Sequence, residues 1–140
     1  MNLKRWLHAS LAALAVILGL EIVLYTALLQ DMYRETAAVW RPAPDLARLM
    51  PLLWAGMAVS TLFFTLIYAQ GYERHKAGVA QGMRFGLYMG LFYFTLYVAV
   101  SYVVLPIPAA LAAWWLLGGI VEYVAAGAIV GWMYRTEQPT

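Results

Sequence analysis

The chain has 140 residues, of which 64% are hydrophobic and 11% are charged, whereas a typical soluble domain is roughly half apolar and about a quarter charged. With a mean hydropathy of +0.72, these proportions indicate a membrane protein whose first partner is the lipid bilayer. The net charge of only +2 excludes the basic footprint that nucleic-acid binding needs. The absence of cysteine excludes disulfides, thiol nucleophiles and thiolate metal sites.

Four apolar runs predict transmembrane helices over residues 7–29, 49–69, 82–104 and 109–134, because a helix needs about 20 apolar residues to cross the hydrocarbon core. The runs occupy most of the chain and leave no room for a soluble domain. We therefore expect residues 1–140 to form one all-α domain, a polytopic membrane protein with four helices in an antiparallel bundle. The first run exceeds the roughly 7 to 15 residues of a secretory signal, so we expect it to be retained as a span.

The connections between the runs carry signals of their own. Residues 30–50 form the only sizeable polar connection, and Pro42 and Pro44 break any continuous helix there. Asp45 is well placed to cap the start of the second span. The Leu-Pro-Ile-Pro segment at 105–108 ends the third span and suits the first turn of the fourth. The third and fourth spans should therefore form a tight antiparallel hairpin.

Basic residues set the expected orientation. They gather at the amino terminus, in the second connection and at the carboxyl end: Lys4, Arg5, Arg74, Lys76, Arg84 and Arg135. Because Lys and Arg near span ends favour the cytoplasmic side, both termini should be cytoplasmic. Arg74, Lys76 and Arg84 are also candidate contacts for anionic lipid headgroups, although topology alone accounts for their placement. Trp114 and Trp115 fit an aromatic belt at the outer interface.

Glycines recur at helical spacing in the last two spans. The third span carries Gly78, Gly82, Gly86 and Gly90, and the fourth carries Gly119, Gly127 and Gly131. Helices in lipid associate where small residues let their backbones approach closely. These glycines therefore predict helix packing, and whether they pack within one chain or between two chains stays open.

Glu21 and Glu122 are the only charged residues well inside the predicted spans. A carboxylate at mid-bilayer costs about 2.5 kcal/mol or more, so such residues face the protein interior and find partners. Counting about 1.5 Å per residue from the span ends places the two at levels that differ by about 6 Å. The candidate hydrogen-bonding partners are tyrosines: Tyr25, Tyr93, Tyr97 and Tyr123. In one dry site the two carboxyls would not both ionise, so at least one should hold a proton.

This acidic pair admits three interpretations: a neutral clasp between helices, a proton or ion site, or a contact with a partner subunit. The serines lack the partners of a nucleophile, and His8 and His75 have no second ligand at metal-binding spacing. We therefore expect no catalytic residue, no metal site and no cofactor.

Several segments of the second half resemble an uncharacterised family of small four-span bacterial integral membrane proteins. They are Tyr72-Glu73, the Gly-Met-Arg-Phe-Gly-Leu run at 82–87, the Leu-Pro-Ile-Pro turn at 105–108, and residues 127–134. The resemblance implies a four-span fold and a multi-pass location in the bacterial inner membrane. It implies no activity.

Two classes of function follow from the sequence. The first is an accessory or self-associating membrane subunit, present as a homo-oligomer or in a larger membrane complex, with its glycine faces against other helices. The alternative is a small proton- or cation-coupled transporter or channel that uses Glu21 and Glu122. A glycine face shared between chains would favour the first class, and a cavity that reaches both acids would favour the second.

Overall fold

The computed structural model describes residues 2–73 and 78–134. Within these ranges the chain is all-α, without strands: α1 (Leu3–Leu24), the π-helix η1 (Tyr25–Leu29), α2 (Gln30–Glu35), the 3-10 helix η2 (Ala37–Val39), α3 (Ala43–Gln70), α4 (Gly78–Val104) and α5 (Ala109–Tyr134). Four stretches are long and apolar enough to cross a membrane: Leu3–Glu35, Ala43–Gln70, Gly78–Val104 and Ala109–Tyr134. The predicted all-α class and its four membrane helices are confirmed.

The first membrane helix is longer than the predicted span. It begins at Leu3 and continues through η1 into α2, which ends at Glu35. The first part of the predicted polar connection is therefore helical, and the continuous helix is interrupted at residues 40–42, which include Pro42, the first of the prolines that were predicted to break it. Asp31 and Arg34 also form an ion pair of 3.2 Å one turn apart on α2, which supports the extra helix.

The second membrane helix, α3, begins at Ala43, with Pro42 as its N-cap and no side-chain cap. Asp45 lies in the first turn rather than at the cap, so the predicted capping role was wrong. Pro42 already fixes an extended entry to the helix, and Asp45 instead places its negative charge near the positive end of the helix dipole. Pro51 lies inside α3.

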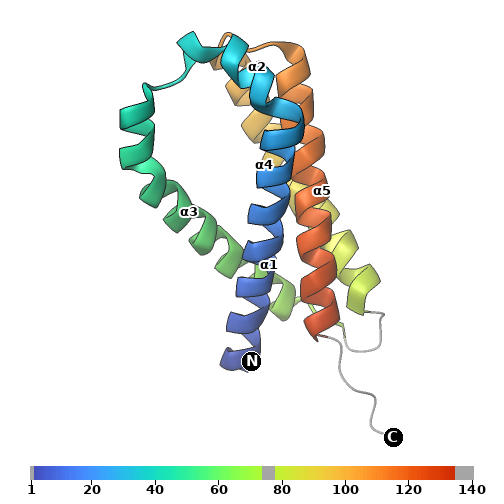
Figure 1. Cartoon of the computed structure of the whole chain (residues 1–140). Helices are drawn as coiled ribbons and strands as arrows, with labels where there is room; N and C mark the ends of the chain where they lie inside the picture. Colours follow the sequence, from blue (N-terminus) through green and yellow to red (C-terminus); the bar gives the residue numbers. More distant parts are fainter. Residues whose placement is uncertain (1, 74–77, 135–140) are drawn as a thin grey trace, which may run out of the picture.

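The glycines of α4 face those of α5 within the chain. A Cβ atom on Gly82 would overlap the carbonyl group of Gly127, with the carbonyl carbon at 2.8 Å. On Gly86 it would lie 2.7 Å from the carbonyl carbon of Tyr123, and on Gly131 it would lie 2.8 Å from that of Gly78. The two backbones therefore touch along the first half of α4 and the second half of α5, the two helices that run beside each other in Figure 1.

Helix α1 packs against α5. Near its start, Arg5 Nε donates a hydrogen bond to the Met133 carbonyl at 2.8 Å, and its guanidinium lies 5.1 Å from the Tyr134 ring centre. Further along α1, the Leu24 side chain occupies the position that a Cβ atom on Gly118 of α5 would need. The first and fourth spans are thus neighbours, and their described ends Leu3 and Tyr134 lie at the same end of the molecule (Figure 1).

Helix α3 is attached only by its second half. Its buried residues are Thr61, Phe64, Thr65 and Tyr68, where Thr65 is hydrogen-bonded to Ser10 of α1 and Trp6 Nε1 donates to the Leu62 carbonyl at 3.2 Å. The first half of α3 leaves the other helices in Figure 1. Its side chains there are exposed, with Leu52 at 72%.

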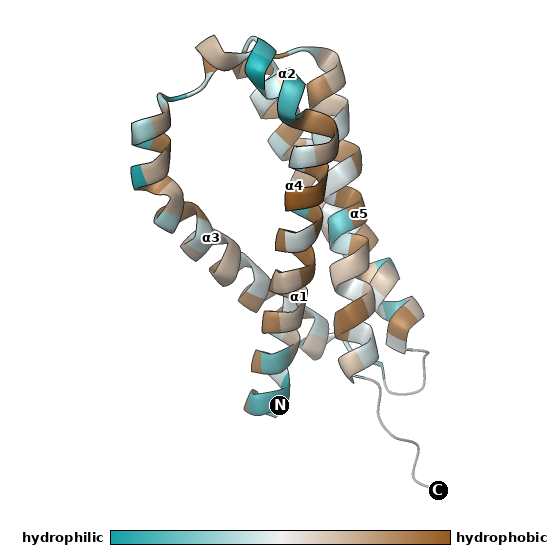
Figure 2. Ribbon diagram, in the orientation of Figure 1, coloured by the Kyte–Doolittle hydropathy of each residue, from teal (hydrophilic) through white to brown (hydrophobic). Residues whose placement is uncertain are grey.

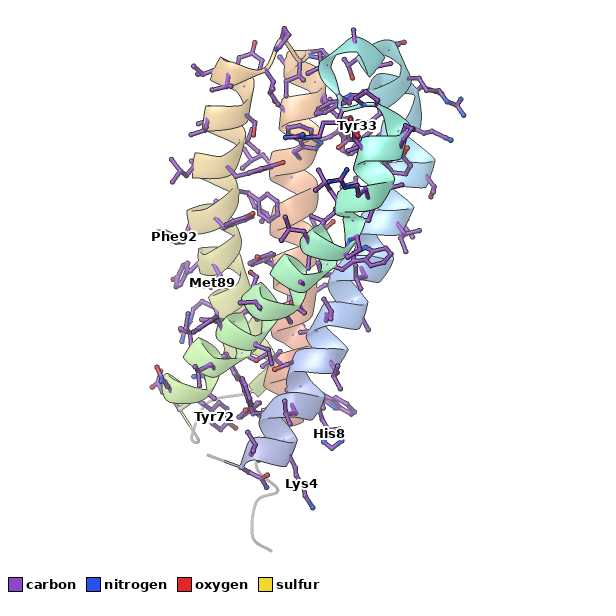
Figure 3. The ribbon with its side chains drawn as sticks, turned by 90° about the vertical axis from the view of Figure 1, so that its left-hand side faces the viewer. Lys4, His8, Tyr33, Tyr72, Met89 and Phe92 are labelled. Atoms are coloured by element: carbon purple, nitrogen blue, oxygen red, sulfur yellow. The ribbon has the colours of Figure 1, made fainter. Side chains whose placement is uncertain are left out.

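The outer surface of the helices is apolar, as expected where lipid replaces water. Figure 2 shows brown, hydrophobic residues along the long helices and teal residues mainly at α2 and at the helix ends. Phe92 points away from the other helices in Figure 3 and is 76% exposed. Lys4 and His8 mark the amino-terminal end in the same view.

Candidate functional site

Two separate apolar cores lie along the molecule. The core toward the termini is built by α1, α3 and α5 from Ala9, Ala13, Ile17, Phe64, Tyr68, Tyr123, Ala126, Val130 and Tyr134. The core toward the opposite end consists of Leu29, Val98, Ile107, Leu111, Ala112 and Trp115. The space between them is not filled by side chains.

A cavity of about 760 Å³ occupies that space, a size typical of sites for small molecules. All four membrane helices contribute to its lining. The polar and aromatic residues of the lining are Glu21, Tyr33, Ser60, Thr61, Tyr93, Phe94, Tyr97, Trp115, Glu122 and Tyr123. Both intramembrane acids therefore face one cavity.

Glu122 is the buried member of the acidic pair. It lies on α5 between Gly119 and Ala126, is only 4% exposed, and lines the cavity. Its Oε1 atom has no hydrogen-bond partner among the residues that the structure describes. A buried polar atom without a partner costs about 1 to 3 kcal/mol, so this oxygen is poised to accept a donor from the cavity.

Glu21 is the accessible member of the pair. It lies on α1, one turn before η1, and is exposed toward the cavity that it lines. Both acids line the same cavity, and their carboxyls lie close enough to interact, so side chains bridge the predicted difference of about 6 Å in level. Because two neighbouring carboxyls in one largely apolar site do not both ionise, the pair should hold one proton between them.

Three of the predicted tyrosines line the cavity and stack on one another. The Tyr93 ring is nearly parallel to Tyr97, with centroids 5.9 Å apart, and to Tyr123, with centroids 6.1 Å apart. The Phe94 ring packs edge to face against Tyr123, with centroids 5.4 Å apart. The structure thus brings Tyr93, Tyr97 and Tyr123 together in one aromatic wall near the acids.

Two further aromatic residues of the site were not predicted. Trp115 is only 8% exposed, and its Nε1 donates a 2.8 Å hydrogen bond to the Tyr33 hydroxyl, so its ring faces the protein interior and not the surrounding lipid. The spacing from Trp115 to Glu122 is two helical turns, which puts them on one face of α5 and could have revealed it. Tyr33 carried no such signal, because the π-turn of η1 shifts the helical register between it and Glu21.

The remaining predicted site residues lie elsewhere. Tyr25 does not line the cavity; its side chain is 45% exposed, and its ring packs 5.4 Å from that of Tyr33. Arg84 lies near the start of α4, away from the cavity, and forms an ion pair of 4.0 Å with Glu73. Arg74 and Lys76 lie outside the described residues.

No group of three or more His, Cys, Asp or Glu within residues 2–73 and 78–134 could hold a metal ion. The site therefore offers two carboxyls, hydroxyls and aromatic rings. Comparison of the chain with models of known protein families, with curated proteins and with solved structures finds no match.

Proposed function

We propose that this protein is a small multi-pass carrier of the bacterial inner membrane that exchanges a proton for a cation at Glu21 and Glu122. One observation carries the proposal: the two acids line the wall of one cavity, and the buried Glu122 has an Oε1 atom without a hydrogen-bond partner among the described residues. A cavity that reaches both acids favours a transporter over an accessory subunit.

The chemistry of the pair supports exchange. With one shared proton the pair carries a single negative charge, which limits the cost of bare carboxylates inside the membrane. A cation that enters the cavity supplies positive charge, so the shared proton can leave and both carboxylates can face the cation. When the cation leaves, a proton must return. Cation and proton therefore compete for the same oxygens.

A sealed end supports alternating access. Between the cavity and the termini, aromatic rings pack against one another: Phe64 with Phe85 and Tyr123, Tyr68 with Phe85 and Tyr134, and Tyr72, which follows α3, with Tyr134. The positive-inside rule supports a cytoplasmic position for both termini and for this seal. In that orientation the cavity lies in the outer half of a four-helix membrane domain.

The alternative of an accessory subunit loses its main argument. That proposal needed glycine faces free for other chains, whereas Gly82, Gly86, Gly127 and Gly131 contact one another's helices within the chain. Binding to a partner protein therefore stays a prediction, and the described residues do not indicate where such a partner would bind.

The orientation leads to a topology prediction. A reporter that fluoresces only in the cytoplasm should be bright when it is fused to either end of the chain. When it is inserted between Thr36 and Trp40, in the connection that precedes α3, it should be dark. Fluorescence of cells expressing the three fusions, normalised to protein amount, is the measurement. A bright insertion together with dark terminal fusions would reverse the orientation.

The function itself is tested in liposomes that contain the protein and a pH-sensitive dye. External Na⁺, K⁺ or benzyltrimethylammonium is added against an acidic interior. We expect at least one of these cations to drive proton efflux, and we expect Glu122→Gln to lower that rate about tenfold or more, which corresponds to about 1.4 kcal/mol. Glu35→Gln is the control, because Glu35 is an exposed acid at the end of α2.

The result that contradicts the function is equally specific. No proton movement with any of the three cations, or equal rates for the native protein and Glu122→Gln, would show that the acids only hold helices together.

A further inference from the structure

We propose that the cavity takes a lipophilic organic ammonium ion, with its charged nitrogen at the Glu21 and Glu122 pair and its apolar body against the aromatic wall. This inference rests on the proposed function and names the class of cation that the carrier would exchange. It is carried by the size of the cavity, its aromatic lining and its continuity with the lipid-facing surface of α3.

The size and ligands of the cavity disfavour a bare inorganic ion. A site of about 760 Å³ is far larger than a dehydrated ion, and a hard divalent cation such as calcium requires six to eight oxygen ligands at short distance. The lining offers two carboxyls and a few hydroxyls, and most of it is apolar. An organic ammonium ion needs only one or two charged partners and fills the remaining volume with its own carbon atoms.

The aromatic residues suit such a cation. Rings attract an alkylammonium group over their faces, and the interaction is worth about 0.5 to 2 kcal/mol when water is excluded. The lining contains six rings from three segments: Tyr33, Tyr93, Phe94, Tyr97, Trp115 and Tyr123. The Tyr33 hydroxyl is fixed by Trp115 and the Tyr93 ring by its two stacked neighbours. The wall is therefore already ordered before a ligand arrives.

The cavity continues to the lipid-facing surface along the detached half of α3. Leu49, Leu52 and Leu53 line it and are also exposed at the surface. Gly56 lines it as well, and an added Cβ there would meet nothing within 4 Å. A ligand dissolved in the outer leaflet can enter here without crossing a polar barrier, provided that its body is lipophilic.

The titratable groups that face the pair determine the pH dependence. They are Tyr33 from α2, Tyr93 and Tyr97 from α4, and Tyr123 from α5, whereas α3 contributes only the hydroxyls of Ser60 and Thr61. The two carboxyls are thus the groups that exchange a proton with the ligand. Because the proton and the ammonium ion compete for them, acid should weaken binding.

Equilibrium dialysis with radiolabelled benzyltrimethylammonium tests the inference on the purified, detergent-solubilised protein. Its uncharged isostere, neopentylbenzene, is measured in parallel. We expect saturable binding of the cation, and we expect that binding to weaken as the pH falls. Glu21→Gln and Glu122→Gln should each raise the dissociation constant at least about tenfold, which corresponds to about 1.4 kcal/mol of binding free energy. Tyr97→Leu should weaken binding about threefold to tenfold through the lost ring face.

Phe92→Leu is the matched control, because Phe92 is an aromatic residue of α4 that points away from the other helices (Figure 3). Its binding should equal that of the native protein. Each variant is first checked for native helix content and a single size-exclusion peak. If Glu122→Gln fails this check, Glu21→Gln decides alone, since Glu21 is exposed to the cavity.

The outcomes separate this inference from the function on which it rests. If Na⁺ or K⁺ drives proton efflux but benzyltrimethylammonium does not bind, the inference is overturned and the exchange function stands. If the ammonium ion binds in a carboxyl-dependent way but no cation drives efflux, the ligand class stands and transport fails. Equal binding of neopentylbenzene would overturn the inference, because charge would then play no part.

Discussion

Gly86→Leu is expected to lower the free energy of unfolding of the monomer by about 3 kcal/mol or more, the upper range for overpacking a tight contact. A Cβ atom at this position would lie 2.7 Å from the Tyr123 carbonyl carbon and 2.9 Å from the Val124 Cα atom. Both atoms belong to the α5 backbone, which cannot rotate away as a side chain can. The two helices would have to separate, and the contacts of Gly82 with Gly127 would be lost with them.

Gly19→Leu is the matched control, because an added Cβ at Gly19 meets nothing within 4 Å and leucine forms helix better than glycine by close to 1 kcal/mol. The measurement is the thermal midpoint in detergent, followed by fluorescence-detected size exclusion. If Gly86→Leu kept the monomer's midpoint and instead abolished self-association, the glycine face would contact a second chain. The accessory-subunit hypothesis would then regain its support.

The parts of the fold that could be predicted follow from rules that lipid imposes on any sequence. Apolar runs of sufficient length must form helices, which identified the four membrane helices. Four-residue glycine spacing marks a face for close packing, and α4 and α5 meet along that face. The extension of the first helix could not be predicted in the same way, because polar residues such as Asp31 and Arg34 fit a helix end and a loop equally well.

The candidate site could be predicted only in its chemistry. A charge inside an apolar run is visible in the sequence, so Glu21 and Glu122 could be found, and their levels could be compared by counting. Their contact depends on α1 packing beside α5, which no local pattern encodes. The cavity itself depends on α3 leaving the other helices, and its exposed leucines look the same in the sequence as leucines that face lipid.

A substitution at Glu122 distinguishes the two remaining explanations of the acidic pair, a clasp between helices and an exchange site. Glu122→Met removes the carboxyl and keeps a similar side-chain volume. If the contact between the Glu21 and Glu122 carboxyls serves as a clasp, the variant should lose about 1 kcal/mol of stability. If the pair is an exchange site, the buried carboxyl with its unpartnered Oε1 lowers the stability of the native protein. The Glu122→Met variant should then be more stable than the native protein.

We expect the second result, a gain of about 1 to 2 kcal/mol for Glu122→Met, because the variant no longer buries a polar atom without a hydrogen-bond partner. Proton exchange should be lost in the same variant, since a thioether holds no proton to exchange. Unfolding midpoints and dye-detected proton efflux, measured on one preparation, supply both readouts. Glu122→Gln is the control, because its amide stays polar and should bring little of this gain. If the Glu122→Met protein were less stable and kept its proton flux, the pair would be a clasp between helices. A residue that is retained for its chemistry is instead expected to lower stability and to be required for activity.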